Sequence, residues 1–155
     1  MKKLISTTFV GMALCATVAV AGTVGADDVK IVDGVIEASL TGVAGNAATG
    51  REVFADRKLG NCLACHQNND LKELSFHGEV GPEMNGVADR YEAGELRAIL
   101  VNSKAVFGDQ TIMPAFYHIH DKTGFRVADK FLGKTILSAQ DVEDVIAYLQ
   151  TLKDE

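Results

Sequence analysis

Two cysteines and a histidine, Cys62, Cys65 and His66, stand in the pattern Cys-x-x-Cys-His. This spacing is the attachment pattern of c-type haem. Two thiols three positions apart on a turn can each form a thioether with one vinyl group, and the next side chain can supply an imidazole nitrogen to the iron. The motif therefore predicts one covalently bound haem c, tethered by Cys62 and Cys65, with His66 as an axial iron ligand.

The cysteine pair alone leaves other uses open. A thioredoxin-like redox pair would have a strand before it and a helix opening at the first cysteine, and it is not usually followed by histidine. A zinc site would need a second ligand pair, and the one other cysteine, Cys15, lies in the N-terminal stretch. An exported protein could also join the two thiols in a disulfide. The histidine that directly follows Cys65 favours haem over all three.

The second axial ligand is sought among the methionines and the other histidines. Met113 precedes Pro114, which biases the backbone of Met113 toward an extended conformation and suits a loop that presents a side chain. It also lies on a late loop before the last predicted helix, which is the usual order in small cytochromes. We therefore expect Met113 and His66 to bind the iron. The alternatives are Met84, which is otherwise a packing residue, and His77, His118 and His120, which are otherwise partly solvated loop residues.

The dipeptide Gly81-Pro82 follows the haem motif in the sequence. A proline carbonyl on this side of a haem commonly accepts the ring N–H of the histidine ligand, which fixes the tautomer and raises the basicity of the ring. We expect Pro82 to have this role; the alternative is a turn without cofactor contact.

The N-terminus has the layout of a secretory signal. Lys2 and Lys3 precede an uncharged apolar run, which small residues close at Ala19-Val20-Ala21 and at Val24-Gly25-Ala26. Residues 1–26 are predicted to be the signal peptide, with cleavage after Ala26 or, as second choice, after Ala21. A retained membrane anchor and a lipoprotein attached at Cys15 are the alternatives. Cleavage would leave a periplasmic protein without membrane attachment.

The composition describes an acidic globular protein. The chain has 155 residues, 47% hydrophobic and 23% charged, with a net charge of −6. Loss of Lys2 and Lys3 with the signal makes the remainder more acidic. The length allows one domain, and the lack of a basic tract argues against nucleic acid as a partner.

Helical patterns bracket the haem motif. Apolar spacing predicts helices over 47–59, 92–102 and 138–152, of which the last carries a capping pattern and the clearest apolar stripe. We expect this terminal helix to cross the first one near Gly50 and Phe54, where the glycine allows close approach. Residues 67–91 and 103–137 are predicted to be long loops around the haem. The fold class is therefore all-α, with residues 27–45 as an N-terminal extension and 46–155 as the haem domain.

The order of helix, haem motif, loops, methionine and terminal helix resembles class I cytochromes c over about residues 46–153. A narrower similarity, to the SoxX family, is carried by the haem motif, by Val80-Gly81-Pro82, by Met113-Pro114-Ala115-Phe116-Tyr117 and by the tail from Phe131 to Leu149. Members of that family are mono-haem subunits of the SoxAX sulfur-oxidation complex.

The resemblance implies a SoxA-type partner in the periplasm. The complex would link thiosulfate oxidatively to a cysteine of the carrier SoxYZ, and this subunit would take electrons and pass them to a small soluble cytochrome. No cysteine is left as a substrate nucleophile once haem is attached, which agrees with electron transfer. Phe116, Tyr117 and residues 118–133 are candidates for the subunit contact or simply cover the haem. A free electron shuttle is the alternative function, and a peroxidase or sensor with an open iron site is a third.

Overall fold

The computed structural model describes residues 22–121 and 127–154. Over this part the chain forms five α-helices, four short 3-10 helices (η) and one isolated bridge between Val32 and Val35, with no β-strand. The elements are, in chain order, η1 Ala26–Asp28, α1 Ala47–Ala55, η2 Cys62–Ala64, η3 Asn69–Leu71, α2 Val87–Arg90, α3 Ala93–Val101, α4 Ser103–Phe107, η4 Asp129–Phe131 and α5 Ala139–Leu149. The all-α prediction is confirmed, whereas most of the predicted signal peptide lies outside the described residues.

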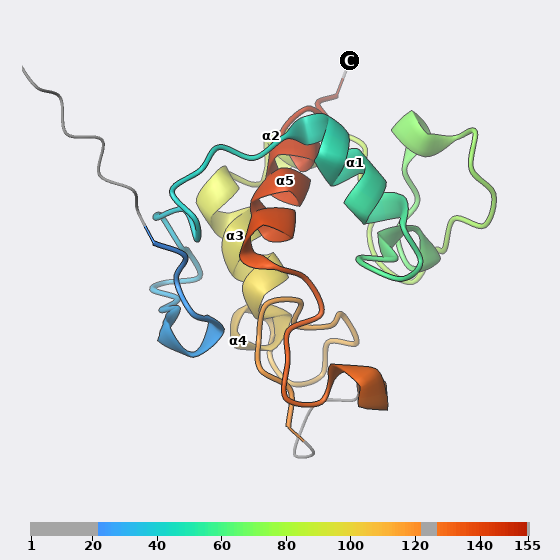
Figure 1. Cartoon of the computed structure of the whole chain (residues 1–155). Coiled ribbons are helices and arrows are strands. Elements are labelled where there is room, and N and C mark those ends of the chain that lie inside the picture. The colour runs from blue at the N-terminus through green and yellow to red at the C-terminus, as the bar shows by residue number, and fades with distance from the viewer. Residues whose placement is uncertain (1–21, 122–126, 155) are drawn as a thin grey trace, which may run out of the picture.

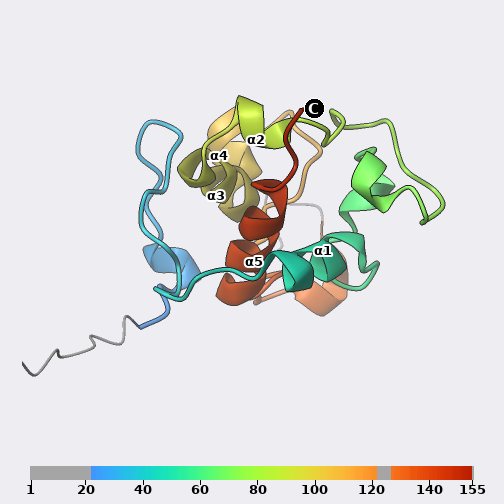
Figure 2. The same ribbon diagram turned by 90° about the horizontal axis from the view of Figure 1, so that it is seen from above.

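Helix α5 is the centre of the fold, with α1 and α3 packed against it (Figure 1, Figure 2). Its start is fixed by a capping box, in which Ser138 accepts from the backbone of Asp141 and the Asp141 side chain accepts from the backbone of Ser138. Five of its larger apolar side chains are buried, namely Val142, Val145, Ile146, Tyr148 and Leu149. The predicted apolar stripe thus forms the core against α1 and α3.

Helices α1 and α5 cross where α1 carries Gly50. A Cβ atom added at Gly50 would collide with the backbone oxygen of Asp144, so only glycine allows this approach. One turn later the rings of Phe54 and Tyr148 meet edge to face, with 5.7 Å between their centroids. The crossing predicted near Gly50 and Phe54 is confirmed.

Replacing Gly50 by alanine is expected to destabilise the fold by about 1–3 kcal/mol, because the new methyl group overpacks the helix crossing. The matched control is Thr49→Ala, which introduces alanine at the preceding position of helix α1, where the side chain is exposed. An exposed substitution of this kind should change stability by no more than about 0.5 kcal/mol. Urea unfolding of the haem-loaded protein measures both, and equal losses would contradict the role of the crossing.

Helix α1 is shorter than the sequence predicts. It ends at Ala55, and Asp56 takes an extended backbone conformation with ψ of 119°, so Arg57 lies outside the helix and is exposed. The prediction of a helix to Leu59 is wrong, because the chain turns at Asp56 toward the haem motif. The loops predicted over 67–91 and 103–137 contain two short helices, α2 and α4.

Residues 22–45 pack on the helices through a buried ion pair. Arg97 of α3 donates to both carboxylate oxygens of Glu143 of α5, at 2.8 and 3.0 Å, and to the backbone oxygen of Ile36 at 2.7 Å. Glu143 also accepts from the backbone N–H of Leu40 at 2.8 Å. This one pair therefore joins α3, α5 and the N-terminal segment.

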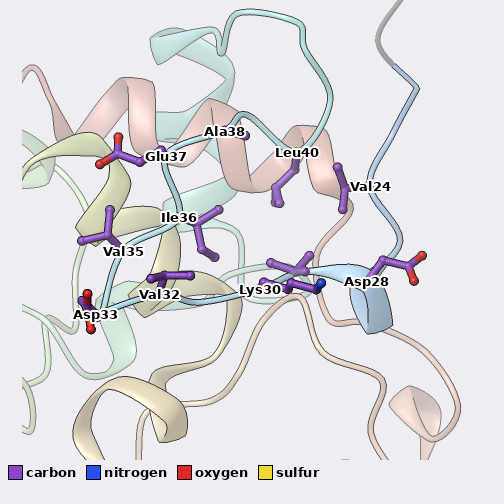
Figure 3. A pocket seen from close by; sticks show the side chains of 11 residues that line it. Val24, Asp28, Lys30, Val32, Asp33, Val35, Ile36, Glu37, Ala38 and Leu40 are labelled. Carbon is purple, nitrogen blue, oxygen red and sulfur yellow. The ribbon is translucent and has the colours of Figure 1, made fainter.

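The N-terminal segment encloses a pocket of about 560 Å³, in which Ile36 and Leu40 point inward while Glu37 points away (Figure 3). Its lining contains no histidine, cysteine or methionine, so it offers no group that could bind a haem iron. Within the described ranges, no helix is both long and apolar enough to cross a membrane.

Candidate functional site

The haem motif is held in a tight turn after α1. Cys62 opens the short helix η2, and the backbone N–H of both Cys65 and His66 donates to the Cys62 oxygen, at 3.0 and 2.9 Å. Gly60 lies just before the turn, and a Cβ at that position would be 3.0 Å from the Cys62 sulfur. The turn therefore brings the two cysteines and the histidine to one place, as the motif predicts.

A cavity of about 850 Å³, here called the central cavity, lies between this turn, α3 and the loop before α5. Its volume is within the roughly 300–1,000 Å³ usual for cofactor sites. All five residues predicted for the haem site line it: Cys62, Cys65, His66, Pro82 and Met113. Much of the remaining wall is apolar and includes Leu96, Ile99, Leu100, Phe116, Ile136, Val145 and Leu149. An apolar cavity with two thiols, an imidazole and a thioether in its wall fits haem c.

The ring of His66 is fixed by Gly81 and Pro82. The distance from His66 Nδ1 to the Pro82 oxygen is 2.7 Å, and because a carbonyl only accepts, Nδ1 carries the proton. Nε2 is therefore the ring nitrogen that can bind iron. A Cβ at Gly81 would collide with Cε1 of the ring, so Gly81 packs directly on it. The Pro82 oxygen and Gly81 together fix the orientation of the His66 ring.

The segment 78–84 runs along the haem motif and is bonded to it through the backbone. Gly78 donates to Leu63 at 2.7 Å, Gly81 to Cys65 at 2.8 Å and Met84 to Gln67 at 2.8 Å. Three regularly spaced backbone bonds hold Pro82 in place under His66. The position of the ring therefore depends on this segment as a whole.

Met113 is presented from another wall of the cavity. Its backbone oxygen accepts from the Ser103 hydroxyl at 2.6 Å, and Ser103 is fully buried at the start of α4. Three residues further on, the chain is tied to α3 by a 2.9 Å bond from the Phe116 N–H to the Leu100 oxygen. Met113 is partly buried beside the core and lines the central cavity together with His66.

The other candidates for the second axial position differ in their surroundings. Met84 also lines the cavity, but it is buried and lies on the segment that is bonded to the haem motif. His77 uses both ring nitrogens within its own loop, since Nδ1 accepts from Asn68 N–H and Nε2–H donates to the Leu71 oxygen, each at 3.2 Å. These contacts favour Met113 as the second iron ligand, because it lies on a segment separate from the haem motif and from segment 78–84.

His118 and His120 do not line the central cavity. Their rings meet edge to face at 5.8 Å between centroids, and Nε2 of His120 bonds the Ala115 oxygen at 2.8 Å. His120 is only 1% exposed, so the expectation of a partly solvated loop residue is wrong for it. The pKa of His120 is lowered, mainly because the ring is buried. This residue supports the loop that carries Met113.

The surroundings of the cysteine pair do not fit a disulfide, a redox pair or a zinc site. The structure does not join Cys62 and Cys65 in a disulfide. Burial, with a smaller contribution from Cys65, raises the pKa of the Cys62 thiol to about 12, the opposite of a reactive redox thiol. Over the described part of the chain, no group of three or more His, Cys, Asp or Glu could hold a metal ion. A short 3-10 turn, rather than a helix after a strand, carries the pair.

A polar network next to the haem motif was not predicted from the sequence. The Tyr148 hydroxyl donates to Asp70 at 2.8 Å and accepts from the fully buried Asn68 at 2.9 Å. Arg51 of α1 donates to the same Asp70 carboxylate at 2.8 Å and, as the largest cause, lowers the pKa of Asp70. The network joins α1, α5 and the loop after the motif, and the polar group at the tip of Tyr148 within an apolar stripe was its only sequence signal.

Phe116 and Tyr117 do not present a docking surface. They are 5% and 7% exposed, and the Tyr117 hydroxyl donates to the Val24 oxygen at 2.7 Å. Phe116 lines the central cavity, as the second interpretation of its role requires, whereas Tyr117 does not line it. Of the segment 118–133, residues 122–126 lie outside the described residues.

Comparison with known proteins places these observations in one family. The cytochrome c family matches residues 47–153. A chain in the crystal structure of SoxXA from P. pantotrophus is similar to this chain, with 38% sequence identity, a TM-score of 0.76, and coverage of 86% of this chain and 100% of the other. The similarity to the SoxXA chain covers more of this chain than residues 47–153 contain, so it also includes residues before Ala47. The comparison with curated protein sequences found no match.

Proposed function

The chain belongs to the cytochrome c family, and within it to the SoxX-type mono-haem subunits; from this premise we propose that it is the electron-transfer subunit of a periplasmic SoxAX complex. The class I fold and one covalently bound haem c follow from family membership. The observation that carries the proposal is that Cys62, Cys65, His66 and Met113 all line one apolar cavity.

Each of these residues has a defined role in the proposal. Bound haem c supplies a reversible one-electron couple. Cys62 and Cys65 would hold it through thioethers, and His66 and Met113, which line different walls of the cavity, would bind the iron. Pro82 keeps the proton on Nδ1 of His66, so Nε2 is directed to the metal. A methionine as second ligand raises the reduction potential above that of a bis-histidine site.

With both His66 and Met113 bound, the iron would have no open position for substrate, so the chemistry of this subunit is transfer of charge. In the proposed complex a SoxA-type subunit carries out the oxidative linkage of thiosulfate to a SoxYZ cysteine. The electrons released pass through this chain to a small soluble cytochrome. The similarity to a SoxXA chain over its full length supports this over a free shuttle.

Export is proposed from the basic and apolar pattern of residues 1–26. Residues 22–26 already belong to the packed structure, because the Val24 N–H donates to the Leu40 oxygen at 2.7 Å and its own oxygen accepts from Tyr117. Cleavage after Ala21 would keep both bonds, which supports the second of the two predicted sites.

Substituting Met113 with alanine is expected to abolish the near-infrared sulfur-to-iron absorption band, because the thioether ligand is lost. The ferrous variant should then bind carbon monoxide, which the parent protein should not bind. The matched control is Met84→Ala, a methionine in the same cavity, which should retain the band. A band unchanged in the Met113 variant and lost in the Met84 variant would reassign the ligand.

The partner is tested separately. The proposed complex requires that the haem-loaded chain co-purify with a SoxA-type cytochrome from cells that express both. A chain that stays monomeric beside SoxA and is reduced by a quinol-linked complex would instead be a free shuttle.

A further inference from the structure

The large apolar side chain with the greatest exposure among the described residues is Phe76, at 83%. Its φ of +68° lies in the left-handed region, which bulky residues rarely occupy. Leu74, two residues earlier, is 41% exposed. Neither side chain lines the central cavity, so their exposure does not depend on the cofactor. An exposed aromatic residue in a strained backbone conformation indicates a function outside the fold itself.

The loop that carries Phe76 is fixed on both sides. Before it, Leu71 is fully buried; after it, the His77 ring bonds the Leu71 oxygen and the N–H of fully buried Asn68, both at 3.2 Å. The conformation of Phe76 is therefore imposed by its anchored neighbours. A loop whose backbone is already fixed loses little backbone entropy on binding.

The same loop is attached to the haem motif. Gly78 donates to the Leu63 oxygen at 2.7 Å, and a Cβ at Gly78 would collide with the Ala64 oxygen. The guanidinium carbon of Arg57 lies 5.9 Å from the centre of the Phe76 ring, and Arg57 also lines the central cavity. Phe76 therefore stands directly beside the haem site.

The charges around the cavity indicate the chemistry of the partner. Arg57, Lys58 and Lys130 line it, and among the described residues no acidic one does, although the chain carries 21 Asp and Glu. A second copy of this chain bound face to face would bring these cations against each other. An anionic membrane would be repelled by the net charge of −6. The surface fits a protein with an apolar pocket for an aromatic ring and carboxylates at its edge.

We propose that Phe76 and Leu74 are the apolar anchor through which the SoxA-type subunit binds this chain beside the haem, with Arg57 and Lys58 facing acidic groups of that subunit. The inference rests on the proposed function, which supplies the partner. Aromatic residues and arginine are the types enriched in interface cores, where few residues carry most of the binding energy. Electron tunnelling falls steeply with distance, so an anchor beside the haem places the partner where transfer requires it.

The test is the affinity of haem-loaded variants for the purified SoxA-type subunit, measured by titration calorimetry. Phe76→Asn and Leu74→Asn should each weaken binding at least about 10-fold. Asparagine accepts the left-handed conformation better than phenylalanine, so Phe76→Asn should leave the thermal stability of the isolated subunit equal or higher. A residue with a merely structural role would lower both affinity and stability.

The controls are Val32→Asn and Val43→Asn, which alter valines 65% and 60% exposed in the N-terminal segment. They should bind the partner like the parent, and all variants should keep the parent haem spectrum. If both loop variants bind like the parent, or if the controls weaken binding equally, Phe76 and Leu74 are not the anchor. Neither result would contradict the proposed complex with the SoxA-type subunit. A parent chain that does not bind the SoxA-type subunit at all would instead overturn the proposed function. Loss of a homodimer in the Phe76 variant would reassign the surface to a second copy.

Discussion

A Cys62→Ser, Cys65→Ser variant is expected to emerge without covalently bound haem and without a stable fold. The central cavity measures about 850 Å³. Much of its wall is apolar, and contact of this wall with water would cost about 25 cal/mol per Å² of exposed apolar surface. The walls must therefore collapse or admit water when the cofactor is not tethered, and the packing of α3 and α5 against the loops is lost.

Acid–acetone extraction and whole-protein mass measure the tethered haem, and far-ultraviolet circular dichroism measures the remaining helix. In the parent protein the haem should resist extraction and both sulfurs should resist alkylation. His77→Ala, which changes a histidine outside the cavity, should retain the haem. A colourless parent protein whose two thiols react freely would refute the haem assignment and everything built on it.

Replacing Arg97 by alanine is expected to lower the free energy of unfolding by about 3–5 kcal/mol. The two side chains of the Arg97–Glu143 pair are 9% and 5% exposed, so the variant leaves a buried carboxylate without its cation. It also removes the bond to the Ile36 oxygen. Replacing both partners, by methionine and leucine, should restore part of the loss, because no unpaired charge remains but the Ile36 oxygen and the Leu40 N–H still lose these bonds.

Arg51 of helix α1 provides a matched control for Arg97, because it also forms ion pairs but is more exposed. Arg51 pairs with Asp70 and Glu73, but these side chains are 39%, 44% and 54% exposed. Solvent screens such pairs, so Arg51→Ala should cost only about 0–1 kcal/mol. Urea unfolding of the haem-loaded variants compares the two. Equal losses would show that burial does not set the strength of the Arg97 pair.

The haem site was largely predictable because its chemistry is local in sequence. Cys62, Cys65 and His66 form one short motif, Pro82 belongs to a Gly-Pro dipeptide of a kind that often supports such a histidine, and Met113 precedes a proline on a late loop. All of them line one cavity in the structure. The terminal helix was predictable for a similar reason, since its cap and stripe lie within one short segment.

Features that depend on distant contacts were not predictable. The end of α1 at Ala55 is set by the turn toward the haem motif, and its sequence continues with good helix formers. The burial of Arg97 requires Glu143, which is 46 residues away, and the burial of Tyr117 requires Val24, which is 93 residues away. Single-sequence periodicity carries no information on such pairs.

Cys62 is 9% exposed, and a Cβ at Gly60 would lie 3.0 Å from its sulfur; this burial has a consequence for biogenesis. A ligating enzyme must reach this thiol to join it to a vinyl group, and it cannot do so once the chain has closed. Maturation therefore has a fixed order, in which attachment comes first and the final compaction of the polypeptide follows. Because the untethered chain lacks a stable fold, the thiol stays accessible to the ligating enzyme until the cofactor is in place.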